Sequence, residues 1–295
     1  MTTSRGASAE AIQFHYDLAN EFYALWLDSS MTYTCALFAD GEDATALHQA
    51  QMRKLDDHAA QAGVVAGARV LDIGCGWGGM LRRLLRVSGA SQVVGLTLSA
   101  QQKTWIEGEP DPRLEVRLED WQDHNPAEPY DAIVSVEAME AFVRPGQSTA
   151  ERVAVYRKLF DRCRSWLRPG GMVSLQTIAY GNARPEDLDR FISEQIFPES
   201  DLPRLAEIAE AIEQRFEIVR LVNDRAQYLR TVRAWLARLR SNRTAAISMV
   251  GPENVQRYEE YLRLCTYMFA SGSCDLYRIA LRRIDRPHVT RRTTN

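Results

Sequence analysis

The sequence has little that would place the chain in a membrane, export it or bind a metal ion. Its first ten residues, MTTSRGASAE, are polar and small, and no apolar run reaches membrane-spanning length without charges. There are five histidines, and they form no pair at metal-ligand spacing. We therefore expect a cytoplasmic protein with no metal site and no stable membrane insertion.

Cysteine and net charge are also scarce. Five cysteines are scattered singly through 295 residues, and an odd number without close pairs favours free thiols in a reducing compartment. The formal net charge of −3 gives no general reason to expect a nucleic-acid partner, and we expect the basic tail at 283–295 to be solvated.

What the chain does contain is an alternation of short apolar segments with amphipathic helical segments. Strands are predicted at 68–74, 91–99, 113–120, 130–137 and 171–180, with helices at 78–89, 100–108 and 151–167. Because the connections are short, the strands should be parallel and covered by helices on both faces. This pattern predicts an α/β fold.

The segments around this alternating part are predicted to be mainly helical. Helices are expected at 10–27, 41–64, 184–198, 202–214, 228–240 and 254–272, with further strands at 216–224 and 274–284. No linker is evident, so we predict a single domain over 1–295. It would comprise an N-terminal helical cap at about 1–60, a Rossmann-like core at 61–222, a helical cap insertion with the final strand at 223–282, and the tail.

The strongest local motif is the stretch VLDIGCGWGG at 70–79. An apolar strand carries Asp72 and runs into Gly74 and Gly76, which let backbone amides approach a ligand, and a helix N-terminus follows. The carboxylate of Asp72 suits an ammonium group and would repel a pyrophosphate. A ligand with an ammonium group and a carboxylate is an amino acid, and methionine is the amino-acid half of S-adenosylmethionine. We therefore predict this cofactor rather than an ordinary tight turn.

Two later strand ends offer groups for the nucleoside half of the cofactor. The second strand ends in GLTLSAQQ without an acid, which leaves Thr97 and Gln102 as hydrogen-bonding groups. After the third strand, LEDWQD offers Asp120 for the adenine amino group and Trp121 as a stacking face. Asp120 taken alone is equally well explained as a surface-turn residue.

Two acids, Glu137 and Glu140, follow the fourth strand in the stretch SVEAMEAF. Ligands gather at the carboxyl ends of strands in open sheets, so one of these acids should be the base or counter-charge of the reaction. Burial would raise the pKa of a carboxyl that faces the pocket. The alternatives are a helix cap for Glu137 and a buried scaffold acid for Glu140. We rank Glu140 first and Glu137 second.

Taken together, these motifs resemble the cyclopropane fatty acid and mycolic acid cyclopropane synthases, a family that includes plant alkaloid N-methyltransferases. The resemblance rests on HYDLANEFYALWLDSSMTYTCALF at 15–38, VLDIGCGWGG, VVGLTLSAQQ and the segment around Glu140, and it spans about residues 12–282. It implies the Rossmann-like class I methyltransferase fold, a mostly parallel seven-stranded sheet with helices on both faces and an added helical cap. It also implies S-adenosylmethionine as the cofactor.

The resemblance assigns roles to individual residues by position. The residues matching its cofactor contacts are Tyr33, Gly74, Gly76, Thr97, Gln102 and Trp121. With Asp72 and Asp120 from the motifs above, and Thr34 beside Tyr33, they make up the predicted cofactor site. Glu140 and Tyr228 match side chains that hold a bicarbonate ion, which is the general base of the cyclopropane synthases, and Cys35 lies where the family closes over the reaction centre. Tyr16 and Gln176 are expected in the substrate pocket.

The chain departs from the family at this reaction centre. Ala141 and Gln176 stand where the family has histidines. Glu137 stands where cyclopropane synthases often have a small residue and the N-methyltransferases have an acid. We therefore predict that bicarbonate is not essential to turnover, and that Ala141 leaves room for a differently shaped substrate.

These observations predict an S-adenosylmethionine-dependent methyltransferase acting on carbon of an apolar, alkene-containing small molecule or acyl chain, in specialised metabolism. The many aromatic residues at both ends of the chain fit an apolar substrate. Three alternatives stay open: N-methylation of a small amine, cyclopropane formation on an unsaturated fatty acyl lipid, and an inactive member with a structural or regulatory role. The sequence does not decide between a monomer and a homo-oligomer.

Overall fold

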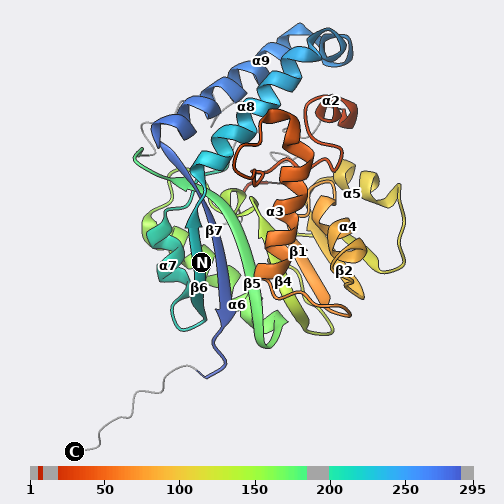
Figure 1. The fold of residues 1–295 in the computed structure, drawn as a ribbon. Coiled ribbons are helices and arrows are strands. Elements are labelled where there is room, and N and C mark those ends of the chain that lie inside the picture. The colour runs from red at the N-terminus through yellow and green to blue at the C-terminus, as the bar shows by residue number, and fades with distance from the viewer. Residues whose placement is uncertain (1–5, 9–18, 185–198, 287–295) are drawn as a thin grey trace, which may run out of the picture.

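The computed structural model describes residues 6–8, 19–184 and 199–286, which form a twisted sheet with helices around it (Figure 1). Its strands are β1 (Arg69–Ile73), β2 (Gln92–Thr97), β3 (Leu114–Leu118), β4 (Tyr130–Val136), β5 (Leu167–Tyr180), β6 (Phe216–Asn223) and β7 (Cys274–Arg283). They lie in the order β3-β2-β1-β4-β5-β7-β6. β7 runs antiparallel to β5 and β6, and the pairs from β3 to β5 are parallel. The predicted mostly parallel, seven-stranded sheet is confirmed.

The described helices fall where the sequence pattern predicts them, except that the last one begins at Arg243 rather than at 254 and is interrupted at Gly251. They are α2 (Asn20–Ala24), α3 (Leu47–Gln61), α4 (Gly79–Arg86), α5 (Ala100–Glu107), α6 (Thr149–Trp166), α7 (Leu205–Ile212), α8 (Arg225–Ser241) and α9 (Arg243–Ser271), with the short 3-10 turn η2 (Met139–Ala141). Ser99 caps α5 by accepting the Gln102 amide, and Ser148 forms a capping box with Glu151 at α6. The helix predicted at 184–198 lies almost entirely outside the described residues.

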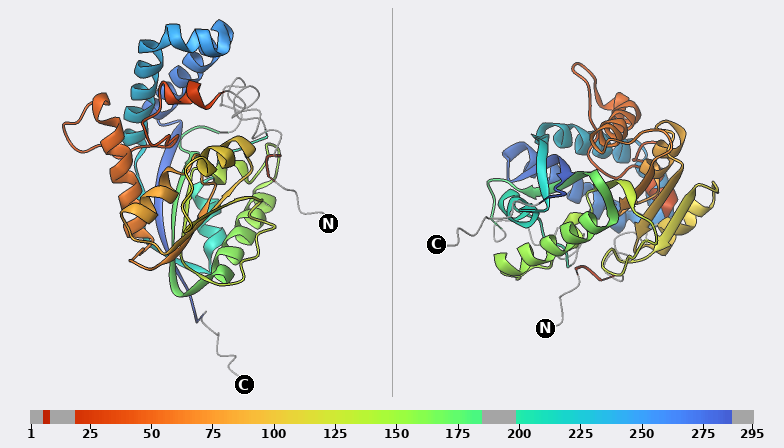
Figure 2. Two further views of the ribbon diagram at one scale, coloured as in Figure 1. Left: turned by 90° about the vertical axis from the view of Figure 1, so that its right-hand side faces the viewer. Right: turned by 90° about the horizontal axis from the view of Figure 1, so that it is seen from below.

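Two helical layers cover the sheet because neighbouring residues of each strand point to opposite faces. On β1, Val70 packs with side chains of α3 and α4, whereas Leu71 packs with side chains of α6 and α7. Figure 2 shows these layers on the two sides of the sheet. The same alternation puts Asp72 on the face that α3 covers.

The α8–α9 hairpin lies beyond the carboxyl ends of the parallel strands, together with α2 (Figure 1). Aromatic side chains of α2, of the turn after it, and of α8 and α9 form one buried cluster there, including Phe22, Tyr23, Trp26, Tyr228, Trp235, Tyr258, Tyr261 and Phe269. The predicted helical cap therefore stands over the strand ends at which ligands bind in open sheets.

The structure also provides information on membrane-spanning helices and on the state of the cysteines. No helix within the described residues is both long and apolar enough to cross a membrane. All five cysteines are buried and free, as their odd number and wide spacing predict.

Candidate active site

The glycine turn after β1 is built to receive a polar ligand. Gly74 and Gly76 have φ values of 82° and 54°, which side-chain-bearing residues rarely adopt. A Cβ on Gly74 would lie 2.4 Å from Ala138 Cβ, so the turn packs directly against the residue that follows Glu137. A Cβ on Gly76 would meet no protein atom within 4 Å, which leaves room beside the backbone for a ligand.

Asp72 is a buried acid with no hydrogen-bond donor at its carboxylate among the described residues. Its side chain is only 2% exposed, and no described residue donates a hydrogen bond to its carboxylate. Burial raises its pKa to about 7, and the nearby ammonium of Lys54 opposes this rise. A ligand ammonium would supply the missing partner, so the residues present fit the amino-acid half of S-adenosylmethionine.

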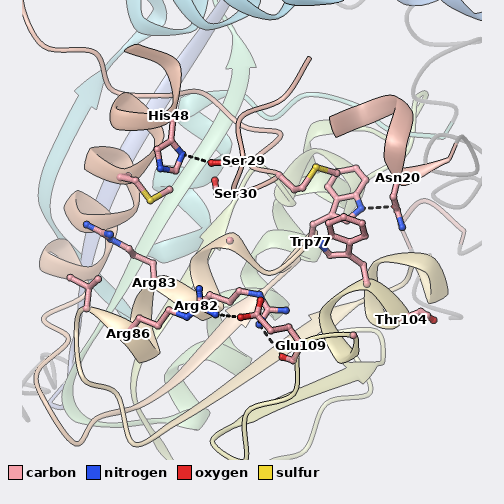
Figure 3. Close-up of a pocket in the computed structure, with 16 residues that line it drawn as sticks. Asn20, Ser29, Ser30, His48, Trp77, Arg82, Arg83, Arg86, Thr104 and Glu109 are labelled. Carbon is pink, nitrogen blue, oxygen red and sulfur yellow. Dashed lines mark hydrogen bonds and ion pairs between the residues drawn. The ribbon is translucent and has the colours of Figure 1, made fainter. Parts of the chain in front are cut away.

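Trp77, next to the glycine turn, connects the turn to helix α2 of the N-terminal cap. Trp77 donates from its indole nitrogen to Asn20 Oδ1 of α2 at 2.8 Å. A hollow of about 790 Å³ opens beside this contact, between α3, α4 and α5 (Figure 3). Its guanidinium groups on α4 are engaged by carboxylates, because Arg83 pairs with Asp56 and Arg86 with Glu109. Arg82 shares Glu109 with Arg86, so three guanidinium groups meet two carboxylates. This hollow contains none of the predicted site residues.

The groups predicted for the nucleoside lie at the ends of β2 and β3. Thr97 and Gln102 are buried, and the Thr97 hydroxyl donates to Gln102 Oε1 at 2.8 Å, which leaves the Gln102 amide NH2 available for a ligand. Asp120 uses one oxygen to accept the Gln122 amide at 2.8 Å. Trp121 is buried and packs against Phe142 with ring centroids 5.4 Å apart.

Glu137, at the end of β4, is the acid that the structure surrounds with donors. Its Oε1 accepts from the Cys35 amide at 2.9 Å and from Gln176 Nε2 at 2.6 Å. Its Oε2 accepts from the Tyr228 hydroxyl at 2.6 Å. Burial raises the pKa of Glu137 above its usual value, and these three donors and the Lys54 charge offset only part of that rise. Glu137 does not cap η2, whose N-cap is Ala138.

The orientation of Gln176 is fixed from behind by a second layer of groups. Arg278 can only donate, and its Nε donates to Gln176 Oε1 at 2.7 Å, so the amide NH2 must face Glu137. His58 Nε2 contacts the same oxygen at 3.0 Å, and its Nδ1 lies 2.7 Å from Ser174 Oγ. Burial lowers the pKa of His58 to about 3, so the ring is neutral.

Glu140 has different surroundings from those expected. Its Oε1 accepts the amide of Ile178, which lies on β5 beyond the last residue paired with β4. Its Oε2 is buried and has no partner within the described ranges. Burial and the neighbouring Glu137 raise the pKa of Glu140 to about 8, so it is protonated at neutral pH. The structure joins Tyr228 to Glu137, and the described residues show no hydrogen bond between Tyr228 and Glu140.

The segment Tyr33–Cys35 closes the centre from the N-terminal side. Thr34 Oγ1 accepts from Lys54 Nζ at 2.6 Å, and the Tyr33 hydroxyl donates to the Tyr261 hydroxyl at 3.2 Å. Burial raises the pKa of the Cys35 thiol to about 12, so the thiol stays protonated and only the backbone amide of this residue serves Glu137.

The sequence analysis missed three ionisable residues that lie next to the Glu137 site. Lys54, His58 and Arg278 are all buried there. The one available signal was the arginine inside the apolar run of β7, since a charge in a buried strand requires a partner. Tyr16 lies outside the described residues. Among those that are described, no cluster of side chains could hold a metal ion.

A family model and individual sequence relatives of this chain point to the same protein family. The model of mycolic acid cyclopropane synthetase matches residues 3–279. Cyclopropane mycolic acid synthase 2 of Mycobacterium leprae (strain TN) is 33% identical over 294 residues, 92% of this chain and 93% of its own. A probable fatty acid methyltransferase of Pseudomonas putida is 33% identical over 283 residues, 92% of this chain and 68% of its own.

A solved structure agrees with the sequence relatives. Mycolic acid cyclopropane synthase CmaA1 complexed with SAH and CTAB is 30% identical, with a TM-score of 0.83 over 94% of this chain and 99% of its own. This likeness confirms the predicted class I methyltransferase fold. The chain is therefore an enzyme of the mycolic acid cyclopropane synthetase family.

Proposed function

We propose that this enzyme transfers the methyl group of S-adenosylmethionine to carbon of an apolar, alkene-containing acyl chain or small molecule. The observation that carries the proposal is the half-buried carboxylate of Glu137. It is held by three donors at a strand end, one residue from Ala138, which packs on Gly74 of the glycine turn. An acid so placed can serve a reaction beside a cofactor bound at that turn.

The cofactor-binding residues divide among three strand ends. Asp72 would hold the amino group. The amides of Gly74 and Cys75 already donate to the Leu96 carbonyl, so the Gly76 amide, just before α4, is the one that suits the carboxylate. The free NH2 of Gln102 suits a ribose hydroxyl, while Asp120 and Trp121 lie at the next strand end for adenine. When bound, S-adenosylmethionine supplies a methyl group already activated for attack.

The chain's own residues then position the acceptor and handle its charge. Attack by an alkene leaves a positive charge on the acceptor, and a base must remove a proton. The carboxylate of Glu137 serves as that base, and aromatic rings of the cap stabilise the charge by about 0.5–2 kcal/mol each. The neutral carboxyl of Glu140 serves to fix β5 and does not compete for the proton.

The acceptor is expected to be apolar. The relatives named above include a mycolic acid synthase and a fatty acid methyltransferase, and the cap over this site is rich in buried aromatic side chains. Ala141 and Gln176 depart from the family's histidines, which favours an acceptor from specialised metabolism over a bulk membrane lipid.

The cofactor assignment predicts a position-specific loss of binding. Gly76→Val should lower the affinity for S-adenosylmethionine by about tenfold or more, because its side chain fills the open space beside the turn and strains a left-handed backbone. Gly67→Val is the matched control, since Gly67 also has a positive φ and open space around its Cβ but lies before β1. Calorimetric titration of both variants measures the difference, and equal affinities would contradict the assignment.

The acceptor class is tested with labelled cofactor. The purified enzyme is incubated with unsaturated acyl esters, their saturated counterparts and small aliphatic amines, and label transfer is followed by mass spectrometry. Transfer to the unsaturated esters alone supports the proposal. Transfer to amines alone would replace it with N-methylation, and tight cofactor binding with no transfer to any acceptor would favour an inactive member.

A further inference from the structure

The backbone at Glu137 has a conformation that favours glycine. Its φ is 54°, in the left-handed region, which costs a residue with a side chain roughly 1–2 kcal/mol. The Glu137 amide still pairs with the Gln176 carbonyl at 2.7 Å, so the position is an ordered continuation of β4 and not a loose loop. Only the side chain offsets the strain, through its three hydrogen bonds.

The three donors around this carboxylate are held by contacts that do not involve it. Gln176 is oriented by Arg278 and His58. The Tyr228 ring stacks on Phe269 with centroids 4.3 Å apart. The neighbouring amide of Ala36 is fixed by Thr231 Oγ1 at 3.0 Å, which holds the Cys35 backbone in place. The donors would therefore still converge if the carboxylate were removed.

The surrounding charge also suits an anion. Lys54 is buried, and its positive charge lowers the pKa of Glu137. Arg278 is buried behind Gln176 and is balanced by Asp224. The acid that neighbours this carboxylate is Glu140, which is neutral at pH 7 because its pKa is raised to about 8. One small anion thus completes the site.

We propose that the Cys35 amide, Gln176 Nε2 and the Tyr228 hydroxyl form a binding site for a small carboxylate, which this chain fills with its own Glu137 side chain. The ligand class is a planar anion with two or three oxygens, such as formate or bicarbonate. The native enzyme binds no such free ion at this point, because the tethered carboxylate occupies the site permanently. The binding site itself does not depend on the proposed function; only the activity readout below rests on it.

The test is to remove the tethered anion and offer a free one. Glu137→Gly empties the site and suits the left-handed backbone. Sodium formate should raise the melting temperature of this variant saturably, by about 2–4 °C over equimolar sodium chloride. Gln214→Gly is the matched control, because Gln214 also has a positive φ of 62° but is exposed and remote from the centre. Neither the control nor the parent should respond to formate beyond the effect of chloride.

Activity gives a second readout. Methyl transfer by Glu137→Gly should fall by about a hundredfold or more and recover at least tenfold with formate or bicarbonate. Stabilisation by formate without recovered transfer still supports the anion site and counts against Glu137 as the base. The proposal is overturned if formate and chloride act alike on the variant, or if bicarbonate activates the parent. A variant that is unfolded in chloride is refolded in formate, where renewed failure to fold also counts against it.

Discussion

At the scale of single residues, one backbone angle decides which of two acids, Glu137 or Glu140, is the better candidate for the catalytic base. From sequence, Glu140 ranked above Glu137 because it matches a family position. The left-handed φ of Glu137 turns its side chain towards Cys35, Gln176 and Tyr228, and sequence periodicity cannot forecast that angle. Glu140 instead satisfies the Ile178 amide that β4 leaves unpaired. We therefore propose the reverse ranking.

This ranking predicts a difference between two conservative variants. Glu137→Gln should lower the turnover rate by about 10²-fold or more, because the general base is lost and an amide cannot accept from all three donors. Glu140→Gln should change the rate at pH 7 less than tenfold, since Glu140 is already neutral there and the amide oxygen can still accept from Ile178. Turnover at saturating substrate is measured for both, with melting curves as a folding check. A larger loss in the Glu140 variant would restore the original ranking.

At the scale of elements, the sequence predicted the strands well and the cross-element contacts poorly. Alternation and glycine stops placed every strand of the sheet, and β5 differs only by beginning at Leu167, where it pairs with Tyr130 before a bulge. The contact of His58 with Gln176 joins residues 118 positions apart, and that of Arg278 with Gln176 joins residues 102 apart. Such distances carry no local pattern, so the support beneath Glu137 could not be read from the chain.

Helix α3 acts as the element that supports the site from one face of the sheet. Gln51 and Lys54 lie one turn apart on it and hold the Thr32–Cys35 segment, since Gln51 Nε2 donates to the Thr34 carbonyl at 2.8 Å and Lys54 donates to the Thr34 hydroxyl. Lys54 also places a positive charge near both Asp72 and Glu137. The helix therefore links the cofactor turn with the reaction centre.

Replacing this charge should shift the pH dependence of the reaction. In Lys54→Met the pKa values of Glu137 and Asp72 should rise, because the charge that lowered them is gone, so the acidic limb of the kcat/KM profile should move up by about one unit. Lys103→Met is the control, as Lys103 pairs with Glu107 on the surface of α5. A merely structural role for Lys54 would lower stability without moving the limb, and an unmoved limb would contradict the electrostatic role.

At the scale of the whole molecule, burying so many ionisable groups makes folding depend on pH. The pKa is raised to about 7 for Asp72 and to about 8 for Glu140, so between about pH 4 and 8 the folded state holds protons that the unfolded state releases. Stability contributed by these acids is lost as the pH rises. The pKa is lowered to about 3 for His58 and to about 8 for Lys54, and these bases act in the opposite direction, over about pH 3–6.5 and above pH 8.

The window from pH 6.5 to 8 separates these effects. His58 is neutral in both states above pH 6.5, and Lys54 is charged in both states below pH 8, so the two acids dominate. The free energy of unfolding without cofactor should therefore fall across the window, by on the order of 2 kcal/mol. Glu140→Gln cannot lose a proton and should reduce the fall to about a third, since Asp72 alone remains and is already partly ionised at pH 6.5. Urea denaturation of both proteins at pH 6.5 and pH 8 measures the two differences. Parallel falls in parent and variant would show that Glu140 is already ionised at neutral pH, and would return it to the list of candidate bases.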